Sequence, residues 1–242
     1  PLSPPAAAPA GSRSFFTSLK SPAEVSIIAE FKKRSPSAGE IRPGASPEAV
    51  ARIYESGGAA AVSVLTDQRY FGGALADLTA VRKTIGLPII RKDFFVDEYQ
   101  IIEAAAAGAN AILLIVACLS DDELRRFADR AATFGLDALV ETHDADELDR
   151  ALRMDAAIIG INNRNLKTMT TDIETGLRLA DRIPAARRDS IVLVAESGIR
   201  NRSDMQRVAD AGFDAALVGE SLMASPDIGA ALDKLVGVGI RR

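Results

Sequence analysis

Short apolar runs alternate with longer amphipathic stretches along this chain from Val25 onward. Short runs without polar interruption are typical of strands buried on both faces, and stretches in which Ala and Leu recur among Arg and Glu are typical of helices. The alternation predicts a parallel sheet covered by helices. The predicted strands cover residues 26–30, 61–65, 88–91, 111–116, 137–140, 157–161, 191–195 and 215–218.

The helix starts between these strands carry polar capping residues, whose side chains accept hydrogen bonds from the first free N–H groups. Eight strand–helix units in 242 residues agree with the usual length of a closed (β/α)8 barrel, the TIM barrel, which typically has ~250 residues. An open doubly wound sheet is the alternative, but its first turn is usually glycine-rich, whereas residues 32–37 read Lys-Lys-Arg-Ser-Pro-Ser. The predicted caps are Ser46, Ser120, Asp144, Ser203 and Ser225.

We expect one domain, in which residues 25–242 form the barrel and residues 1–24 form an N-terminal tail and short helix. Residues 1–11 are rich in Pro and Ala and carry no charge, so they are interpreted as a mobile tail without the features of a secretory signal. Phe15–Leu19 is expected to form a short helix that covers one end of the fold.

Composition limits the classes of ligand and compartment. With a net charge of -4 and a pI of about 5.2, no general attraction for nucleic acid or an anionic membrane is expected. No apolar run approaches the ~18 residues that suggest a membrane span. One cysteine and one histidine exclude an intramolecular disulfide and the usual zinc ligand set. We expect a cytoplasmic monomer without metal or organic cofactor that binds a small molecule.

Charged residues follow the predicted strands at the end where a barrel places its chemistry. Alternation puts Glu30 and Lys32 on one face of the first strand and Phe31 on the other. Because buried charges are costly without partners, this pair indicates either a site or a solvated ion pair. Other strands are followed by Arg91, Lys92, Asp93, Glu141, Asn162, Asn163, Arg164, Glu196, Ser197, Gly198, Gly219, Glu220 and Ser221. Their convergence on one face predicts a charged mouth.

Lys92 is expected to point into this mouth because it alternates with Ile90. An ammonium group near other cations holds its proton less tightly, which suits a general acid, and Glu141 could take a proton elsewhere in the mouth. A structural ion-pair network among the same side chains is the competing interpretation, and the two are compatible.

Small residues after the last two strands predict a phosphate site. Backbone N–H groups can approach an anion at Ser197-Gly198 and at Gly219–Ser221, although ordinary turns are the alternative. Phe71 is expected either to cap an aromatic ligand or to cover the rim. His143 is interpreted as a loop residue rather than a base, and Cys118 as a small buried residue.

Several of these segments resemble the indole-3-glycerol-phosphate synthase family of barrel enzymes. The resemblance implies a lyase of tryptophan biosynthesis, which converts 1-(2-carboxyphenylamino)-1-deoxyribulose 5-phosphate into indole-3-glycerol phosphate with loss of carbon dioxide and water. It also implies that neither a metal nor an organic cofactor is needed. The matching segments are 28–37, 63–67, 88–94, 113–116, 139–141, 160–166, 195–199 and 218–223.

The resemblance also implies roles for the site residues. Lys92 would be the general acid of ring closure, and Glu141 would act as acid or base in the dehydration. Glu30 and Asn162 would hold the reacting groups, and Lys32 would steer the substrate. The remaining contacts would be Glu196 and Ser197 to the sugar hydroxyls, Ser35 and Arg164 to the anthranilate carboxylate, Ser197, Gly198, Gly219 and Ser221 to the phosphate, and Phe71, Phe94, Leu113 and Leu166 to the aromatic ring.

Three alternatives stay open. Phosphoribosylanthranilate isomerase is a related barrel, but its pattern has a cysteine after strand one and an aspartate after strand six, where this chain has Glu30 and Asn162. A class I aldolase would use Lys92 to form a Schiff base. The family usually carries a longer helical extension before the first strand, so this extension is interpreted as shortened. A non-catalytic or weakly active sugar-phosphate-binding barrel is therefore the third alternative.

Overall fold

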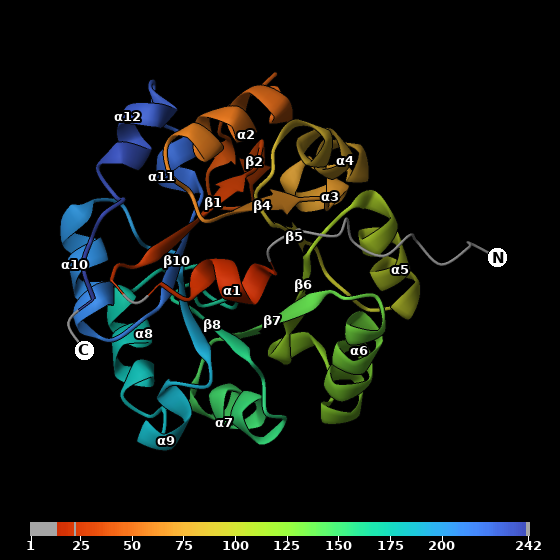
Figure 1. The fold of residues 1–242 in the computed structure, drawn as a ribbon, viewed down its shortest axis with the longest axis vertical. Helices are drawn as coiled ribbons and strands as arrows, with labels where there is room; N and C mark the ends of the chain where they lie inside the picture. Colours follow the sequence, from red (N-terminus) through yellow and green to blue (C-terminus); the bar gives the residue numbers. More distant parts are fainter. Residues whose placement is uncertain (1–13, 22, 241–242) are drawn as a thin grey trace.

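Residues 14–21 and 23–240 are described by the computed structural model of the chain. Within these residues, eight parallel strands close into a barrel in the order β1-β10-β9-β8-β7-β6-β5-β4, and helices form a ring around it (Figure 1). The predicted (β/α)8 barrel is confirmed. Its strands are β1 (Ser26–Phe31), β4 (Ala61–Leu65), β5 (Ile89–Lys92), β6 (Ala111–Ile115), β7 (Asp137–Thr142), β8 (Ile158–Asn162), β9 (Val192–Glu196) and β10 (Ala215–Val218).

Every predicted strand is present, and the largest differences lie at the carboxyl ends. β7 continues through Glu141 to Thr142, and β9 continues to Glu196. Both glutamates still pair in register, Glu141 with Gly160 and Glu196 with Leu217. Because a side chain that points into the barrel leaves its backbone free to hydrogen-bond with the neighbouring strands, the charged residues do not end these strands.

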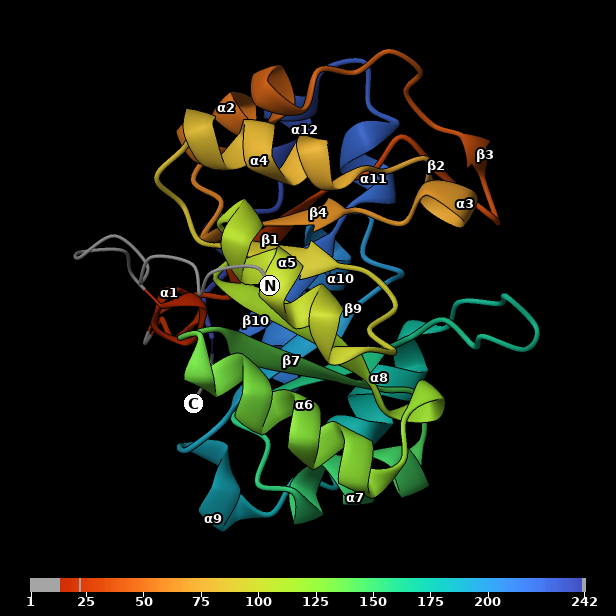
Figure 2. The ribbon, with the colours of Figure 1, turned by 90° about the vertical axis from the view of Figure 1, so that its right-hand side faces the viewer.

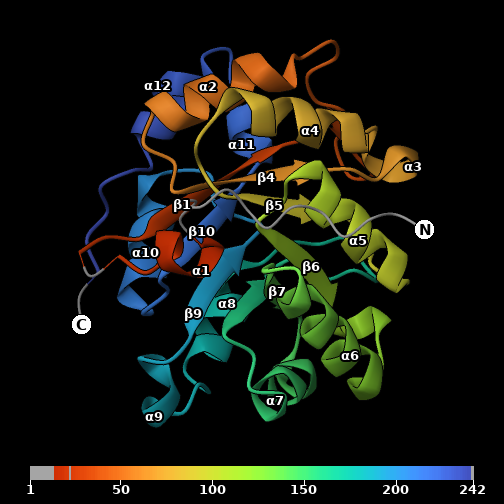
Figure 3. The ribbon, with the colours of Figure 1, turned by 45° about the vertical axis from the view of Figure 1, so that its right-hand side comes forward.

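Helices connect the strands and cover the outside of the barrel, as α2 and α4 do over β1 and β4 (Figure 2 and Figure 3). The loop after β1 also carries a small antiparallel hairpin of β2 (Arg34–Ser35) and β3 (Gly39–Glu40). The helices are α1 (Phe15–Leu19), α2 (Pro47–Ser56), α3 (Gln68–Phe71), α4 (Leu75–Thr84), α5 (Glu98–Ala107), α6 (Asp121–Thr133), α7 (Ala145–Arg153), α8 (Ile173–Ala180), α9 (Ala185–Arg188), α10 (Arg202–Asp210), α11 (Glu220–Met223) and α12 (Ile228–Asp233).

Two of the predicted helix caps are wrong. Ser203 lies inside α10, and Asn201 caps that helix by accepting the N–H of Asp204. Ser225 also does not cap, because Asp227 caps α12 and the Ser225 hydroxyl donates to the Asp227 carbonyl. In both cases an Asn or Asp two residues away supplies the acceptor. The confirmed caps are Ser46, Ser120 and Asp144.

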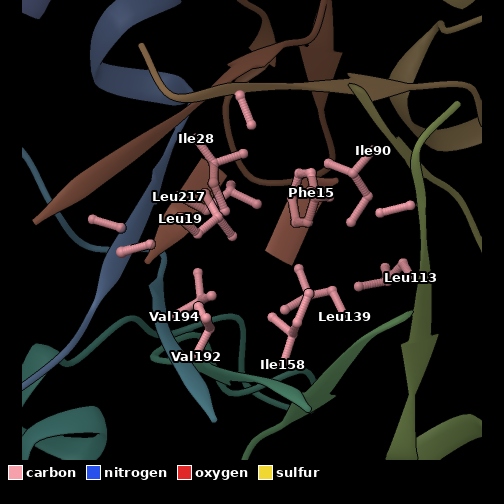
Figure 4. Close-up of a cluster of buried hydrophobic side chains, with 14 of the residues drawn as sticks. Phe15, Leu19, Ile28, Ile90, Leu113, Leu139, Ile158, Val192, Val194 and Leu217 are labelled. Carbon is pink, nitrogen blue, oxygen red and sulfur yellow. The ribbon is translucent and has the colours of Figure 1, made fainter. Parts of the chain in front are cut away.

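The helix α1 closes the barrel at the amino ends of its strands. Phe15 and Leu19 are fully buried, and Figure 4 shows both side chains among the apolar side chains of the barrel interior. The backbone N–H of Phe16 donates to Oδ2 of Asp137 (3.0 Å) at the start of β7. Figure 2 shows α1 on the opposite side of the barrel from β2, β3 and α3. The expected short helix is confirmed, and the carboxyl ends of the strands remain for a site.

Cys118 is exposed, so the expectation that it is buried is wrong. The chain leaves the barrel after Ile115, and Cys118 ends the short 3-10 helix η1 (Val116–Cys118) outside it. The mobile tail predicted for residues 1–11 lies outside the described residues. Among the helices of the described ranges, none is long and apolar enough to cross a membrane.

Candidate active site

Charged side chains form one layer across the barrel at the carboxyl ends of its strands. Alternate strands fill each interior layer of such a barrel, because their inward-pointing side chains lie at the same height. Layers of this kind are usually apolar, so three carboxyl groups and one ammonium group in a single layer mark the centre of the candidate site. The layer consists of Glu30 from β1, Lys92 from β5, Glu141 from β7 and Glu196 from β9.

Lys92 lies between two of these glutamates. Its Nζ donates to Oε2 of Glu141 (2.8 Å) and lies 3.3 Å from Oε2 of Glu196. The three side chains are 13%, 3% and 2% exposed, in the order Lys92, Glu141 and Glu196. The ion-pair network considered as a competing interpretation is thus present. Because it is almost dry, its charges interact more strongly than a surface pair does.

Lys92 holds its proton more tightly than the sequence suggested. Burial alone would lower the pKa of its ammonium group, but the carboxylates of Glu141, Glu196 and Glu30 outweigh burial and raise that pKa. The expectation of a loosely held proton is wrong because carboxylates surround Lys92, while Lys32 pairs with Glu30 at 3.0 Å.

The two glutamates beside Lys92 are shifted in opposite directions. Burial would raise the pKa of Glu141, but Lys92 and His143 outweigh burial and hold that pKa well below its usual value. Burial and the charge of Glu141 raise the pKa of Glu196 to about 8, against the attraction of Lys92. The two carboxyl groups beside the same ammonium group therefore differ in proton affinity, since Glu141 favours the ionised form and Glu196 the protonated form.

A glycine on β8 and another just after β10 make room for these glutamates. A Cβ at Gly160 would lie 2.1 Å from Oε1 of Glu196, and a Cβ at Gly219 would lie 2.6 Å from Oε1 of Glu30. The hydroxyl of Ser63 donates to Oε2 of Glu30 (3.1 Å), which further fixes the position of the Glu30 carboxyl group. Sequence reasoning missed Gly160, although a glycine inside a run of isoleucines indicates a close approach.

A cavity of about 300 Å³ opens beside the charged layer. Ser197 and Gly198 border it with φ angles of 64° and 84°. A non-glycine residue at such a φ is uncommon and turns the backbone sharply. The hydroxyl of Ser221 donates to the Ile199 carbonyl (3.0 Å), which ties the segments after β9 and β10 together. The cavity brings together the predicted residues Glu30, Lys32, Arg164, Ser197, Gly198, Gly219 and Ser221.

Arg164 spans the rim of this cavity. Its Nη1 donates to the hydroxyl of Ser37 (2.7 Å), and its Nη2 lies 3.4 Å from Oε2 of Glu220. Ser35, which was expected beside Arg164, is 3% exposed, and its Oγ accepts the N–H of Ala38. The structure therefore places Ser37 rather than Ser35 against the guanidinium group.

The residues expected to contact an aromatic ring are spread over different parts of the mouth. Phe71 and Phe94 face each other with ring centroids 6.5 Å apart, and Phe94 is 37% exposed. Leu166 is 44% exposed in the loop after β8. Leu113 is buried, and Figure 4 shows it in the apolar cluster that includes Phe15. The structure brings together only the two phenylalanines.

His143 lies in the loop after β7, as interpreted, but its ring turns toward the charged layer. Its Nε2 lies 3.2 Å from Oε1 of Glu141, and its Nδ1 lies 2.9 Å from Oε2 of Glu147. Asn162 reaches the same carboxyl group, since its Nδ2 donates to Oε1 of Glu141 (3.2 Å). A second cavity of about 350 Å³ borders His143, Glu147, Asn162 and Leu166. The sequence signal for this contact was the spacing of two residues between Glu141 and His143, because side chains two residues apart along an extended chain point to the same face.

The carboxyl and ammonium groups of this site suit acid–base catalysis on a negatively charged ligand. Lys32 and Arg164 supply positive charge along the first cavity, and Lys92 supplies it at the bottom of the mouth. Within residues 14–21 and 23–240, no group of three or more His, Cys, Asp or Glu side chains could hold a metal ion.

The sequence model of a known enzyme family, indole-3-glycerol phosphate synthase, matches residues 4–235. The chain belongs to this family. The indole-3-glycerol phosphate synthase of Nocardioides sp. strain JS614 is 51% identical over 213 residues, which cover 88% of this chain and 80% of that protein. The one from Koribacter versatilis is 48% identical over 227 residues, covering 93% and 86%.

Similarity to a solved structure supports the fold alone. Thiamine phosphate pyrophosphorylase from Pyrococcus furiosus superimposes with a TM-score of 0.65 over 87% of this chain and 93% of its own, at 16% sequence identity. The family resemblance and the enzyme prediction are confirmed: the chain has indole-3-glycerol phosphate synthase activity and is a carboxy-lyase of tryptophan biosynthesis. The isomerase, aldolase and non-catalytic alternatives give way to this activity.

Proposed function

We propose that the charged layer of Glu30, Lys92, Glu141 and Glu196 is the catalytic centre for 1-(2-carboxyphenylamino)-1-deoxyribulose 5-phosphate. The observation that carries the proposal is the buried ammonium group of Lys92, 2.8 Å and 3.3 Å from two carboxyl groups with different proton affinities. A single donor between an ionised and a protonated carboxyl group suits a reaction in which protons are given and taken at neighbouring atoms.

The first cavity would bind the charged ends of this substrate. The backbone around Ser197, Gly198 and Gly219 would hold the phosphate, with Ser221 fixing the loop and Lys32 offsetting the charge. Binding the two ends of the substrate would stretch it across Lys92 and bring the ring carbon near the carbonyl group.

Arg164 would bind the anthranilate carboxylate at the rim. Its guanidinium group now contacts Glu220 at 3.4 Å, an exposed partner that a substrate carboxylate can replace. Ser35 and Ser37, in and beside the β2–β3 hairpin, would complete this end. The aromatic ring would then rest against Phe71, Phe94 and Leu166 at the mouth and reach Leu113 in the barrel interior.

Lys92 would protonate the carbonyl oxygen as the ring carbon attacks it. A raised pKa keeps the ammonium group charged until that oxygen becomes a strong base, and the positive charge stabilises the developing alkoxide. Glu141 would then serve the dehydration, first as acid to the leaving hydroxyl and then as base toward the adjacent C–H group. Asn162 and Glu30 would hold the reacting groups, and Glu196 would donate to the sugar hydroxyls.

Turnover of the carboxyphenylamino substrate, followed by indole fluorescence, tests the proposal. The chain contains no tryptophan, so the product emits against little protein background. We expect Lys92→Ala to lower kcat by at least ~10²-fold with little change in KM. Lys83→Ala, an exposed lysine on α4, is the control. Indole formation by Lys92→Ala at the rate of the control would remove Lys92 from its role.

We also infer that the enzyme works as a monomer in the cytoplasm. Every group assigned to the substrate comes from one chain, and a reducing compartment fits a chain with a single cysteine. Light scattering at assay concentration tests the first inference, and a stable dimer there would contradict it.

A further inference from the structure

The proposed reaction consumes a proton in every turnover. The substrate loses its carboxylate as carbon dioxide, so one negative charge disappears and one proton must be taken up. Two protons reach the substrate, one at the carbonyl oxygen and one on the leaving hydroxyl, while one returns from carbon. Lys92 can supply the first, and Glu141 can pass the returning one back to it. A further donor must supply the second while the bound substrate excludes water from the mouth.

His143 connects Glu141 to a carboxylate outside the barrel. Its Nε2 lies 3.2 Å from Oε1 of Glu141, and its Nδ1 lies 2.9 Å from Oε2 of Glu147. The same oxygen of Glu147 accepts the backbone N–H of His143 (2.8 Å), which fixes the ring against α7. On the other side, Oε2 of Glu141 accepts from Lys92. Polar contacts therefore lead from α7 to the centre of the mouth, with hydrogen bonds at both ends and an ion-pair contact, rather than a hydrogen bond, between Nε2 and Glu141.

We propose that His143 is a positioning residue that holds Glu141 toward Lys92 and gives it the proton that each turnover consumes. This inference rests on the proposed function. The Nε2 proton moves to Glu141, and the electron pair of the N–H bond stays on Nε2. The protonated carboxyl group then gives that proton to the hydroxyl, which leaves as water with the C–O electron pair. After product release, water reaches Glu141 and the ring recovers its Nε2 proton along the same path.

The surroundings of His143 favour a stored proton. Burial would lower the pKa of the ring, but its polar contacts with Glu141 and Glu147 and the charges of these two residues outweigh burial and raise that pKa to about 10. Although Cys118 is an exposed residue, partial desolvation of its thiol and the charges of the same two glutamates raise the thiol pKa, so it stays neutral. Glu147 also fixes the remaining proton on Nδ1 after the transfer. The other charged groups around the cavity beside His143 are Asp144, Lys167 and Asp172.

The charge of the ring can be measured directly, because His143 is the only histidine in the chain. We expect the ¹⁵N spectrum of the whole protein to show a ring protonated on both nitrogens at pH 7, above the usual pKa of about 6.5. A neutral ring at pH 7 would overturn the proposal. This readout does not depend on turnover, so it separates the inference from the proposed function.

Two variants then test proton supply. His143→Gln can keep an N–H donor toward Glu141 but has no proton to release, and we expect kcat to fall roughly ten- to a hundredfold at pH 7 with KM within about threefold. Glu147→Gln should lower kcat less and move the alkaline limb of the pH–rate profile to lower pH. Glu123→Gln is the matched control, because Glu123 and Glu147 occupy the same position in the first turns of α6 and α7 and Glu123 contacts Ser120.

Single turnovers with a pH indicator distinguish supply from simple positioning. In the wild type, indole should appear before protons disappear from solution, because His143 lends the proton and is refilled later. In His143→Gln the two signals should coincide, and the solvent isotope effect on kcat should increase. Coincident signals in the wild type, or a His143→Gln variant with wild-type kcat, would refute the proposal. A wild type that forms no indole would refute the proposed function instead.

Discussion

Replacing Gly160 with alanine tests how closely the barrel wall fits the catalytic layer. The new Cβ would lie 2.1 Å from Oε1 of Glu196, so this oxygen must retreat by about 1.4 Å to reach an ordinary contact of about 3.5 Å. Glu196 lies 3.3 Å from Lys92, and both side chains have almost no free space. A misplacement of about 1 Å in a catalytic group costs roughly 10²-fold in rate. We expect Gly160→Ala to lower kcat by about that factor.

The assay needs stability and turnover from the same sample. Overpacking a barrel wall costs about 1–3 kcal/mol, so urea unfolding should show a destabilised but folded variant while indole fluorescence reports kcat. Gly86→Ala is the control, since its new Cβ would meet its nearest atom, Oε1 of Glu55, at an ordinary 3.5 Å. If Gly160→Ala is folded and turns over like the control, the fit between Gly160 and Glu196 does not set the geometry of the site.

Two further predictions concern stability. Phe15→Ala should lower the free energy of unfolding by about 3–5 kcal/mol and leave kcat of the folded enzyme unchanged, because α1 lies at the end away from the site. Phe16→Ala, at a partly buried position, should cost clearly less in urea unfolding, and equal losses would contradict the closing role of Phe15. Burial raises the pKa of Glu196 from 4.5 to about 8, so the unfolded chain releases this proton first and wild-type stability falls as pH rises between those values. Glu196→Gln has no such proton, so its unfolding free energy relative to the wild type should increase from pH 5 to pH 8, and a difference independent of pH would contradict the assignment.

The fold could be predicted from the sequence because each strand is a short apolar run bounded by helix signals. Periodicity also predicts that Lys92 faces inward, since a strand has only two faces. It does not predict what Lys92 meets there. Glu141 and Glu196 come from strands two and four places away in the barrel, and their positions depend on the stagger of closure. The direction of the Lys92 pKa shift therefore required the structure.

In the loop after β7, the signal for a helix start obscured the role of a site residue. Residues after His143 carry the helix start at Asp144, so the sequence favoured a loop role for the histidine. It is in the loop, but Glu147 in the first turn of α7 aims its ring at Glu141. Gly160 lies inside β8, and the space left by its missing Cβ is occupied by the Glu196 carboxyl group, which local sequence signals do not reveal.

The order of the strands has a consequence for how activity arises during folding. Ser26 pairs with Ala215, so the seam between β1 and β10 joins distant parts of the chain, and the layer is closed between Glu30 of β1 and Glu196 of β9 only when that seam forms. Contacts between such distant residues carry a large loop-closure entropy and form slowly. Refolding chains should acquire helical signal first and indole-forming activity last, and a fragment that ends before β9 lacks Glu196. The time at which activity appears during refolding therefore reports when the barrel finally closes.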